Sequence, residues 1–584
     1  MINHSVSDRN WIFSKYEENK VKKINQELGI SELLARLLTI RKVEPEFCEF
    51  FLNPRIKNSM PNPFVLKSMG SAVDAIIKHI KNKSKICIFG DYDVDGASAS
   101  SILGKFLKHL NCDFFIFIPD RIKDGYGPTA KSFTEIINKN VNLIITVDCG
   151  TTAFEAMSLA SDKRVDVVIL DHHQSTETLP TACAIVNPNR FDEATDLTYL
   201  CAAGVSFLFL TALVSKLRDE HYFIRNEIKE PDLFNYLDLV TLGTVCDVVP
   251  LLGLNRAFVF QGLRVMAKRN NLGIKTLSDL SNINSKISTY HIGYILGPKI
   301  NAGGRIGKSH YGTDLLLTED PETAFKLSKE INMLNEKRKN IENIMLDEAK
   351  HLAKLKDNNP VIVLSSNAWH EGIIGIIASR LKDQFNKPVF IINLEGQNGK
   401  GSARSVAGFD IGMAIIKSKQ LNIIKKGGGH KMAAGFSIDV NKINDFEILM
   451  IELFNKSGCA SSKEKDLYID TVLSASALNE DFFLEINKLA PFGSANREPR
   501  FLIENVSVLK SIILKDIHIK AICKTSSNSN IGIISFNSVN TSLGSYLINP
   551  KNKKYDIVGR LSLNEWNGKR EVQFLLDDLS LSKN

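Results

Sequence analysis

The sequence lacks the paired cysteines that mark a zinc site or a disulfide framework. Its nine cysteines, an odd number, are scattered along 584 residues without one Cys-x-x-Cys spacing. Cysteine-type zinc sites and disulfide-stabilised secreted domains both need cysteines at short or regular spacings. We therefore expect reduced thiols that lie in hydrophobic cores.

A long apolar run and a recognisable leader are also missing. No stretch approaches the roughly 20 apolar residues that cross a bilayer. The first residues, MINHSVSDRNWIF, contain no basic region followed by an apolar core. The sequence thus predicts a cytoplasmic protein with no membrane partner.

Charge and composition favour a multidomain globular protein. The formal net charge of +8 permits binding to a polyanion, but so small a surplus on a long chain does not require it. Hydrophobic residues make up 44% and charged residues 24% of the chain, which is typical of globular proteins. The length predicts about three or four domains.

Short β-rich segments alternate with helix-length segments from about residue 70. They are KICIFGD, DFFIFIPD, NLIITVDCG, VDVVILDHH and ACAIVNP. This alternation predicts a mostly parallel sheet in an α/β domain. All but the last end in aspartate or lead directly to one, and ligands of such sheets bind beyond the carboxyl ends of the strands. Acidic side chains should therefore converge there.

The rest of the chain falls into three kinds of segment. Helical apolar spacing fills the first sixty or so residues. A stretch without internal proline or glycine, from Pro321 to Lys356, predicts a helix about 50 Å long, either a rigid connector or a surface helix of the first domain. Beyond it, PVIVLSS and PVFIINL restart a strand and helix pattern, and five strands after about residue 465 predict a small barrel.

The segment GDYDVDG places three aspartates two residues apart. On an extended chain alternate residues share a face, so Asp91, Asp93 and Asp95 would repel one another unless a cation lay among them. A helix–loop–helix calcium site would need a glutamate at the twelfth position, which is Ile102 here. The alternatives left are another metal site and a solvated acidic turn.

Other predicted strand ends and a later segment supply further candidate ligands. They are Asp148 in TVDCGTT, Asp171, His172 and His173 in LDHH, and Asp247 in GTVCDVVPL. Carboxylates with imidazoles and no thiolate suit Mn²⁺ or Mg²⁺ better than structural zinc. So many carboxylates fit two divalent ions, a pair of which activates water and stabilises the oxygens around phosphorus during in-line attack.

These motifs carry a resemblance to a known family. GDYDVDG, DCGT, LDHH and GTVCDVVPL, in this order, resemble the four motifs of the DHH phosphoesterase superfamily. PDRIKDGYGPT, GPKINAGGRIGK, WHEGIIGIIASRL, GKGSARSVAGFDI, GGGHKMAAGFS and LAPFGSANREP resemble the RecJ family of single-stranded-DNA-specific exonucleases over nearly the whole chain. The implied α/β architecture is a helical segment (1–65), a parallel-sheet DHH catalytic domain (66–320), a connecting helix (321–357), a DHHA1-type α/β domain (358–455) and an OB-like β-barrel (465–584).

The resemblance implies an activity and partners. We expect a metal-dependent 5′-to-3′ exonuclease that degrades single-stranded DNA to 5′-mononucleotides in recombination and repair. A DNA helicase and the single-stranded-DNA-binding protein would supply its substrate. One alternative is a relative that acts on short oligonucleotides, cyclic dinucleotides or pyrophosphate, against which the additional barrel argues. Another is a non-catalytic strand-binding protein, which is disfavoured because every metal position is filled.

The resemblance also assigns roles at the metal site. One ion would be held by Asp91 or Asp93 together with Asp148. His173 would face the scissile phosphate or its water, and Asp171 would orient a histidine. Phe89 stands where some relatives have a histidine, so the first ion would lean more on Asp91 or bind weakly. The ligands of the second ion would be Asp95, Asp148, His172 and Asp247.

Arginines in glycine-rich segments are candidates for binding the strand. Ser402 and Arg404 of GSARS lie two apart on one face, and by resemblance they form a 5′-phosphate pocket with Arg121. Asn301 and Arg305 of INAGGRIG would contact the scissile or neighbouring phosphates. The alternative is that these are ordinary surface side chains of a glycine-rich loop.

Two further segments have open roles. His430 in KKGGGHKMAAG could approach a strand closely, although packing between domains would also favour such small residues. In the C-terminal strands, Phe536 and Trp566 could stack on bases or could belong to the core of the barrel.

Overall fold

The computed structural model describes residues 5–121, 124–125, 127–459, 465–551, 553–566 and 569–582. It consists of two compact units. One contains Met1–Arg55 together with Ser462–Asn584, and the other contains Ile56–Ser461.

The larger unit begins with a parallel five-stranded sheet, as the sequence predicts. Its strand order is β3-β2-β4-β5-β6. Helices cover both faces, so strands β2 and β4 are buried throughout, and their residues are apolar apart from Thr146. The strands are β2 (Ile86–Gly90), β3 (Phe114–Phe117), β4 (Leu143–Val147), β5 (Asp166–Leu170) and β6 (Ala184–Val186).

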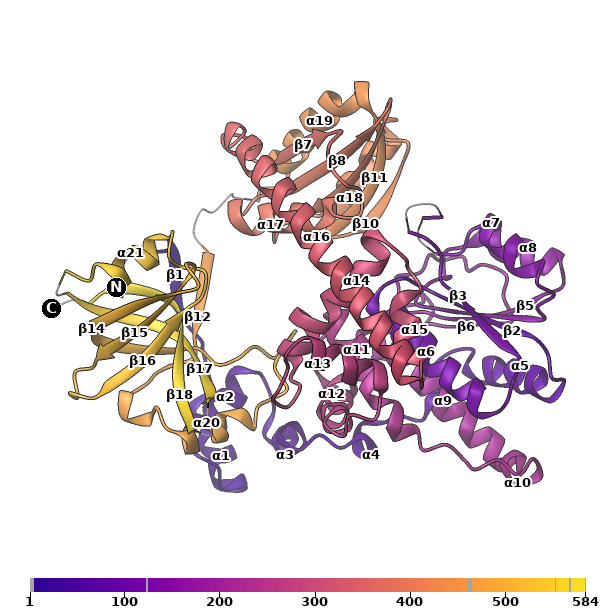
Figure 1. Cartoon of the computed structure of the whole chain (residues 1–584), viewed down its shortest axis with the longest axis horizontal. Coiled ribbons are helices and arrows are strands. Elements are labelled where there is room, and N and C mark those ends of the chain that lie inside the picture. Colours follow the sequence, from indigo (N-terminus) through magenta and orange to yellow (C-terminus); the bar gives the residue numbers. More distant parts are fainter. Residues whose placement is uncertain are drawn as a thin grey trace. The chain divides into compact units, whose positions relative to one another are not determined.

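Two groups of helices cover this sheet. The first group packs on the face that contains Phe89 and Ile144, and the second packs on the opposite face, as Figure 1 shows. The first comprises α7 (Ala130–Ile137) and α8 (Phe154–Asp162). The second comprises α5 (Met69–Lys81), α6 (Val94–His109) and α9 (Ala202–Asp219).

A helical layer follows the sheet in the chain. Helix α11 is buried along nearly its whole length between α6 and α12, and it ends where Asp247 begins the next turn. The principal elements are α11 (Leu237–Cys246), α12 (Gly253–Met266), α13 (Leu272–Leu280), the π-helix η5 (His291–Leu296), α14 (Gly297–Ile306) and α15 (Tyr311–Leu317). Short helical turns are α4 (Ile56–Ser59), η2 (Pro63–Val65), η3 (Leu197–Tyr199), α10 (Tyr222–Arg225) and η4 (Leu233–Tyr236).

The long helix predicted from the sequence is α16 (Pro321–Leu355). Its start is fixed by Pro321 in the first turn and by Asp320, whose side chain accepts a hydrogen bond from the backbone N–H of Thr323 at 2.7 Å. The helix packs first against α13, α14 and α15 and then against α17 (Ile374–Phe385) and β7 (Ile362–Ser366). It is therefore a connector that contacts both parts of the larger unit.

The second part of the larger unit is a mixed sheet. Its order is β10-β11-β9-β8-β7, in which only the β7–β8 pair is parallel. One face packs on α17, and the other packs on α18 (Ile411–Gln420) and α19 (Ile443–Lys456). The other strands are β8 (Val389–Glu395), β9 (Asn398–Arg404), β10 (Lys426–His430) and β11 (Ala433–Asp439), and a short turn, η6 (Val440–Lys442), precedes α19.

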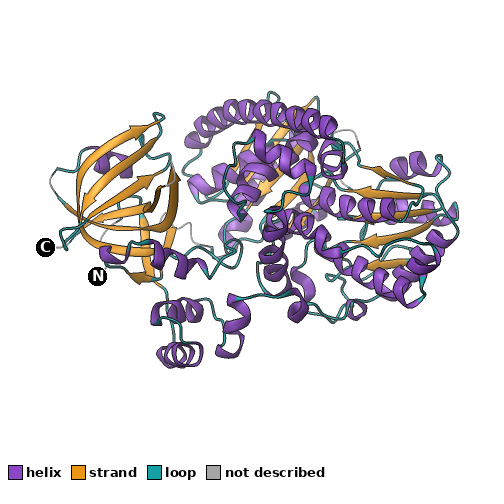
Figure 2. Cartoon of the chain, turned by 60° about the horizontal axis from the view of Figure 1, so that its bottom comes forward, coloured by secondary structure: helices purple, strands orange, loops and turns teal. Residues whose placement is uncertain are grey.

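The smaller unit contains the predicted barrel, whose strands are drawn in orange in Figure 2. The pairings run β14–β15–β16–β18–β17 and return from β17 to β14, so the barrel is closed. Its strands are β14 (Phe501–Leu514), β15 (His518–Lys524), β16 (Asn530–Ser535), β17 (Lys554–Trp566) and β18 (Lys569–Leu581). Around it lie β13 (Thr471–Val472), η7 (Ala475–Ala477), α20 (Glu480–Asn487) and α21 (Ser542–Ile548). The predicted α/β architecture with a C-terminal barrel is confirmed.

The beginning of the chain belongs to the same unit as the barrel. Strand β1 (Arg9–Phe13) pairs in parallel with β12 (Lys465–Ile469), and the first helices share a hydrophobic core with the barrel. These helices are α1 (Glu18–Leu28), α2 (Glu32–Ile40), η1 (Pro45–Phe47) and α3 (Cys48–Leu52). The sequence did not predict this association, and the domain boundaries given above remain a prediction. Among the described helices, none is both long enough and apolar enough to cross a membrane.

Candidate metal and phosphate site

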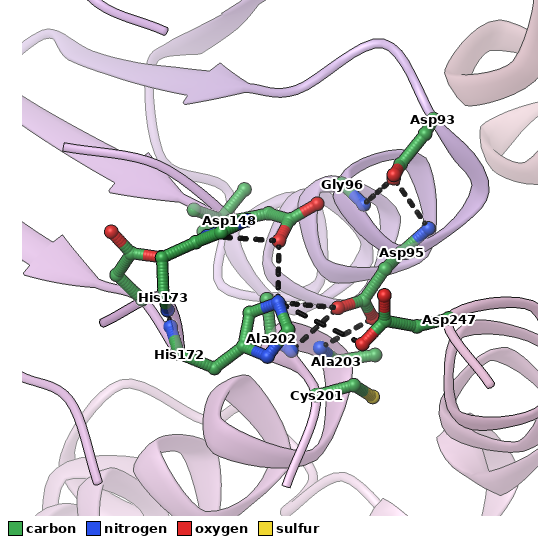
Figure 3. A network of polar contacts seen from close by, with 12 residues as sticks. Asp93, Asp95, Gly96, Asp148, His172, His173, Cys201, Ala202, Ala203 and Asp247 are labelled. Atoms are coloured by element: carbon green, nitrogen blue, oxygen red, sulfur yellow. Dashed lines mark hydrogen bonds and ion pairs between the residues drawn. The ribbon is translucent and has the colours of Figure 1, made fainter. Parts of the chain in front are cut away.

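Three of the predicted acidic residues follow the carboxyl ends of neighbouring strands. Asp91 follows β2, Asp148 follows β4, Asp171 follows β5, and all three are buried. Because these strands are parallel and adjacent, their ends meet at one edge of the sheet. Asp247 reaches the same place from the end of α11, as Figure 3 shows.

The first motif is a strand-to-helix turn. Strand β2 ends at Gly90, and the side chain of Asp93 caps α6 by accepting hydrogen bonds from the backbone N–H of Asp95 at 2.9 Å and of Gly96 at 3.0 Å. A Cβ at Gly96 would lie 2.6 Å from the backbone oxygen of Asp91, so the turn requires glycine. The expectation of one extended chain is therefore wrong, because aspartate caps a helix here. The aspartates still converge.

Asp95 is fixed by the beginning of another helix. Its two carboxylate oxygens accept hydrogen bonds from the backbone N–H of Ala202 at 2.6 Å and of Ala203 at 2.9 Å, in the first turn of α9. These donors were not predicted, and the small residues of LCAAG are the only sequence signal for so close an approach. Burial and the charge of Asp93 nevertheless raise the pKa of Asp95, against the opposing effect of His172.

His172 lies among three carboxylates. Its Nε2 is 3.1 Å from Oδ1 of Asp148, 3.8 Å from Oδ2 of Asp247 and 3.9 Å from Oδ2 of Asp95 (Figure 3). Two sets of ligand atoms lie within 4.8 Å of one another and meet at this position, namely Asp95, His172 and Asp247, and Asp148, His172 and His173. A third such set is Asp91, Asp93 and Asp148. Asp148 thus belongs both to a set that contains histidines and to the set that contains carboxylates alone.

The electrostatics of this cluster favour a bound cation. Burial is the main cause that raises the pKa values of Asp91 and Asp148, and Asp93 is the next for each. Burial and the charges of Asp95 and Asp93 raise the pKa of Asp247 to about 9. Among the described residues, no group donates a hydrogen bond to the buried Oδ1 of Asp91. Carboxylate oxygens and an imidazole in this arrangement fit Mn²⁺ or Mg²⁺.

Asp171 and His173 form a pair beside this cluster, and Nδ1 of His173 also lies 3.9 Å from Oδ1 of Asp148. Nδ1 of His173 lies 2.8 Å from Oδ1 of Asp171, which also accepts from the backbone N–H of both histidines, and Oδ2 accepts from the N–H of Thr151. Burial alone would raise the pKa of Asp171, but the hydrogen bond and the charge of His173 lower it. Burial would lower the pKa of His173, whereas Asp171 raises it to about 9. Asp171 therefore holds the ring of His173 in place.

Two residues that the sequence did not single out support this pair. The amide of Asn187 donates to Oγ1 of Thr151 and to the backbone oxygen of His173, both at 2.9 Å. Its backbone follows β6, the strand next to β5. Asparagine and threonine are common in loops, so nothing in the sequence singles out Asn187 and Thr151. The order of the strands brings the two residues together.

Phe89 lies in a hydrophobic core and belongs to none of the ligand sets. Its ring packs against Phe117 and Phe133, at centroid distances of 5.6 Å and 5.9 Å, inside the core beneath α7 and α8. It therefore points away from the carboxylates. The set of Asp91, Asp93 and Asp148 contains no imidazole.

Asp148 and the residue that follows Asp247 have unusual backbone conformations. Asp148 has φ of 62°, and Val248, directly after Asp247, has φ of 61°. A positive φ is uncommon for aspartate and unfavourable for a β-branched residue. Such conformations persist where surrounding structure enforces them, and they occur most often at functional sites.

Ser402 and Arg404 lie together at the start of α17. They occupy alternate positions of β9, and Nη1 of Arg404 donates to the backbone oxygen of Ala403 at 2.8 Å. A Cβ at Gly375, in the first turn of α17, would lie 3.0 Å from Oγ of Ser402 and 3.5 Å from Nη2 of Arg404. The absence of a side chain at Gly375 keeps the approach to both groups open.

Arg121 and Arg305, which were also predicted to bind the strand, interact electrostatically with each other, and Arg121 also acts on Arg404. Nη1 of Arg305 donates to the backbone oxygen of Gly372, just before α17, at 3.1 Å. Burial lowers the pKa of Arg305 to about 10, and the charges of Arg121 and Arg338 add to this effect. Burial and Arg121 likewise lower the pKa of Arg404. Guanidinium groups that repel one another in this way would be stabilised by an anion that lay among them.

The remaining predicted residues have less defined surroundings. Oδ1 of Asn301 is buried and accepts no hydrogen bond from the described residues. His430 is exposed at the end of the edge strand β10, and within the described part of the chain no ion pair joins it to the carboxylates. Phe536 is exposed beside His518, and the side chain of Trp566 lies outside the described residues.

Fold and site together define a member of the DHH family. The model of the DHH family, N-terminal domain, matches residues 85–244, the DHHA1 domain matches 358–456, and the RecJ OB domain matches 469–578. The single-stranded-DNA-specific exonuclease RecJ of Bacillus subtilis is 32% identical over 585 residues, which is 99% of this chain and 72% of that protein. RecJ of Escherichia coli is 31% identical and covers 88% of this chain, with 90% of its own length matched.

A solved structure gives the same result. The crystal structure of RecJ in complex with Mn²⁺ from Thermus thermophilus is 26% identical, with a TM-score of 0.81 over 99% of this chain and 80% of that chain. The chain belongs to the RecJ family of single-stranded-DNA-specific exonucleases.

Proposed function

We propose that this protein is a metal-dependent exonuclease that degrades single-stranded DNA from its 5′ end to 5′-mononucleotides, in DNA recombination and repair. The observation that carries the proposal is the position of Asp148, which belongs to an all-carboxylate set and to a set that contains histidines. Two divalent ions that share a carboxylate are the arrangement that hydrolyses phosphodiesters by in-line attack. Family membership supports the choice of substrate.

The ligand sets support a proposal for the two metal positions. One ion, Mn²⁺ or Mg²⁺, is assigned to Asp91, Asp93 and Asp148. When bound, such a pair of ions activates a water and stabilises the attacking and leaving oxygens. Structures of Thermus thermophilus RecJ contain Mn²⁺ or Mg²⁺. The second ion is assigned to Asp95, Asp148, His172 and Asp247.

The chain's own residues orient this chemistry. The N–H groups of Ala202 and Ala203 fix both oxygens of Asp95, so this ligand does not have to reorient. Asp171 keeps a proton on Nδ1 of His173, which is assigned to the scissile phosphate or its water. An imidazole held in a fixed orientation in this way could donate or accept a hydrogen bond at the phosphate or at the attacking water.

The direction of digestion is assigned to the arginine pocket. In-line attack on a diester has no inherent direction along a strand. If Arg121, Ser402 and Arg404 hold a terminal 5′-phosphate, only the neighbouring bond is aligned with the metals. Asn301 and Arg305 are assigned to the scissile or adjacent phosphates.

Selectivity for single strands is assigned to steric exclusion. Helix α16 packs on both parts of the larger unit, and Arg305 of α14 contacts the backbone before α17. A path bounded by these elements would admit an unpaired strand and exclude a duplex. His430 is assigned to a contact with the strand, the barrel would bind single-stranded DNA through its own strands, and a helicase and the single-stranded-DNA-binding protein would supply the substrate.

Digestion of end-labelled DNA tests the proposed function. With Mn²⁺ or Mg²⁺, a 5′-labelled single strand should release labelled mononucleotide at once, whereas a 3′-labelled strand should shorten progressively. A blunt duplex of the same sequence should resist. Equal digestion of the duplex, early release of a 3′ label, or a preference for dinucleotides over long strands would contradict the proposal.

A further inference from the structure

The connecting helix α16 carries an arginine on the face that meets both parts of the larger unit. Leu334 packs against Gly307, the residue directly after α14. A Cβ placed on Gly307 would lie 2.9 Å from Cδ2 of Leu334. Met345 belongs to a cluster that includes Ile306 and the first residues of α17. Arg338 lies between these contacts, one turn after Leu334 and two turns before Met345 on the same face. It therefore faces the region between the end of α14 and the start of α17.

The guanidinium of Arg338 is held by two buried side chains. Its Nε donates to Oδ1 of Asn335 at 3.2 Å, and its Nη1 donates to Oε2 of Glu342 at 2.9 Å. The side chain is only 11% exposed. No described residue accepts a hydrogen bond from Nη2, which leaves two N–H donors in a fixed orientation.

The charges around Arg338 leave a positive excess. Glu342 also pairs with Arg380 of α17 at 3.3 Å, so one carboxylate serves two guanidinium groups. Arg338 acts electrostatically on Arg305, whose pKa is lowered first by burial and then by Arg121 and Arg338. A group of buried arginines with so few carboxylates is stabilised when an anion binds among them.

We propose that Arg338 binds a backbone phosphate of the strand and that Glu342 is the positioning residue that holds its guanidinium for this contact. This inference rests on the proposed function. It adds a binding group from the connecting helix to those from the two sheets. Such a group would let α16 sense whether a strand is in place.

Arg380 is the matched control for Arg338. Both arginines pair with Glu342, but the side chain of Arg380 is 63% exposed. If the Glu342 pairs only stabilise the fold, the two arginines should be equivalent for the strand. If Arg338 contacts DNA, only its removal should matter.

Strand binding by Arg338→Gln and Arg380→Gln tests the proposal. Both substitutions are made in the Asp148→Ala protein, which serves as the reference. Binding of a 3′-labelled, 5′-phosphorylated single strand is measured by fluorescence anisotropy over a series of NaCl concentrations. Arg338→Gln should weaken binding about tenfold or more and lower the slope of log K against log salt by about 0.7, as expected for one lost phosphate contact. Arg380→Gln should leave both unchanged. Equal behaviour of the two variants would overturn the proposal.

A second pair of variants separates binding from folding. Arg338→Lys keeps the charge but loses the planar donors, so it should weaken binding with little change in the salt slope. Glu342→Gln should do the same, because Arg338 stays charged but loses its orientation. Wild-type affinity in Arg338→Lys together with a lowered melting midpoint in all variants would show a structural role alone. Failure of the wild-type protein to digest the strand with Mn²⁺ would instead count against the proposed function.

Discussion

Nε2 of His172 lies 3.1 Å from Oδ1 of Asp148, whereas the adjacent His173 is held through Nδ1 by Asp171 at 2.8 Å. Two neighbouring imidazoles therefore have different surroundings. The first lies among Asp148, Asp247 and Asp95, and the second is fixed by Asp171, which belongs to none of the ligand sets.

The two histidines should respond differently to removal. His172→Ala should lower the affinity for Mn²⁺ by tenfold or more, because it removes a ligand at the meeting point of the carboxylates. His173→Ala should bind Mn²⁺ nearly as the wild type does and hydrolyse DNA more slowly. Calorimetric titration with Mn²⁺ measures the first effect, and single-turnover digestion measures the second. Equal loss of metal in both variants would refute this division.

The pocket at the start of α17 should recognise the terminal phosphate. Arg404→Ala should weaken the use of a 5′-phosphorylated strand by at least about 1.5–3 kcal/mol, the range for a hydrogen bond to a charged group. A strand with a 5′-hydroxyl should lose much less, because it never made this contact. Wild type and variant on both strands form a double-mutant cycle. If the substitution affected both strands equally, Arg404 would serve folding or general backbone binding.

Asp238 should make the stability of the larger unit depend on pH. Burial raises its pKa from 3.8 to about 6, despite hydrogen bonding by the N–H of Leu239 and the charge of Lys105. Between these values the folded state keeps a proton that the unfolded state has released. The contribution of Asp238 to the free energy of unfolding should therefore fall by up to about 3 kcal/mol as pH rises through this window.

Asp238→Asn should remove this dependence. The amide oxygen can still accept from Leu239, and Lys105 keeps the nearby charge of Glu319. The variant should thus melt higher than the wild type above pH 7 and about equally near pH 4. Asp74→Asn, at an exposed position of α5, is the control. A variant that kept the wild-type pH profile would show that Asp238 does not cause it.

The association of the chain's beginning with the barrel should depend on Asp578. This buried carboxylate accepts from Nε1 of Trp11 at 2.8 Å and from the hydroxyl of Ser5. Asp578→Ala leaves buried donors without an acceptor and should cost about 2–4 kcal/mol in the smaller unit. Hydrogen exchange in β1 and β12 should rise. Asp466→Ala removes an exposed hydrogen bond of the same two strands and should change little.

The chemistry of the site could be predicted further than its geometry. Carboxylates after buried β-rich segments were enough to predict a metal site, because parallel strands end at one edge. The expected extended aspartate segment was wrong, since Asp93 caps α6 instead. The backbone donors of Ala202 and Ala203 leave only the small residues of LCAAG as a signal, and in the sequence Arg338 is one more charged residue of a predicted helix. Their roles arise only from packing between distant elements.

The fold shows the same limit. The five strands of the parallel sheet and the five of the barrel follow from local patterns of apolar residues and turns. The pairing of β1 with β12 does not, because a five-residue strand contains no information about a partner at Lys465–Ile469. Short strands that pair across the whole chain are determined by tertiary contacts.

The most direct test of this account is the rate of strand digestion by Asp148→Ala with Mn²⁺, measured together with strand binding and a melting curve. Asp148 belongs to the all-carboxylate set and to a set that contains histidines. We therefore expect the folded variant to lose hydrolysis. Its affinity for the strand should stay within a few-fold of wild type, because arginines and stacking hold the DNA. Substantial Mn²⁺-dependent hydrolysis by folded Asp148→Ala protein would contradict the account.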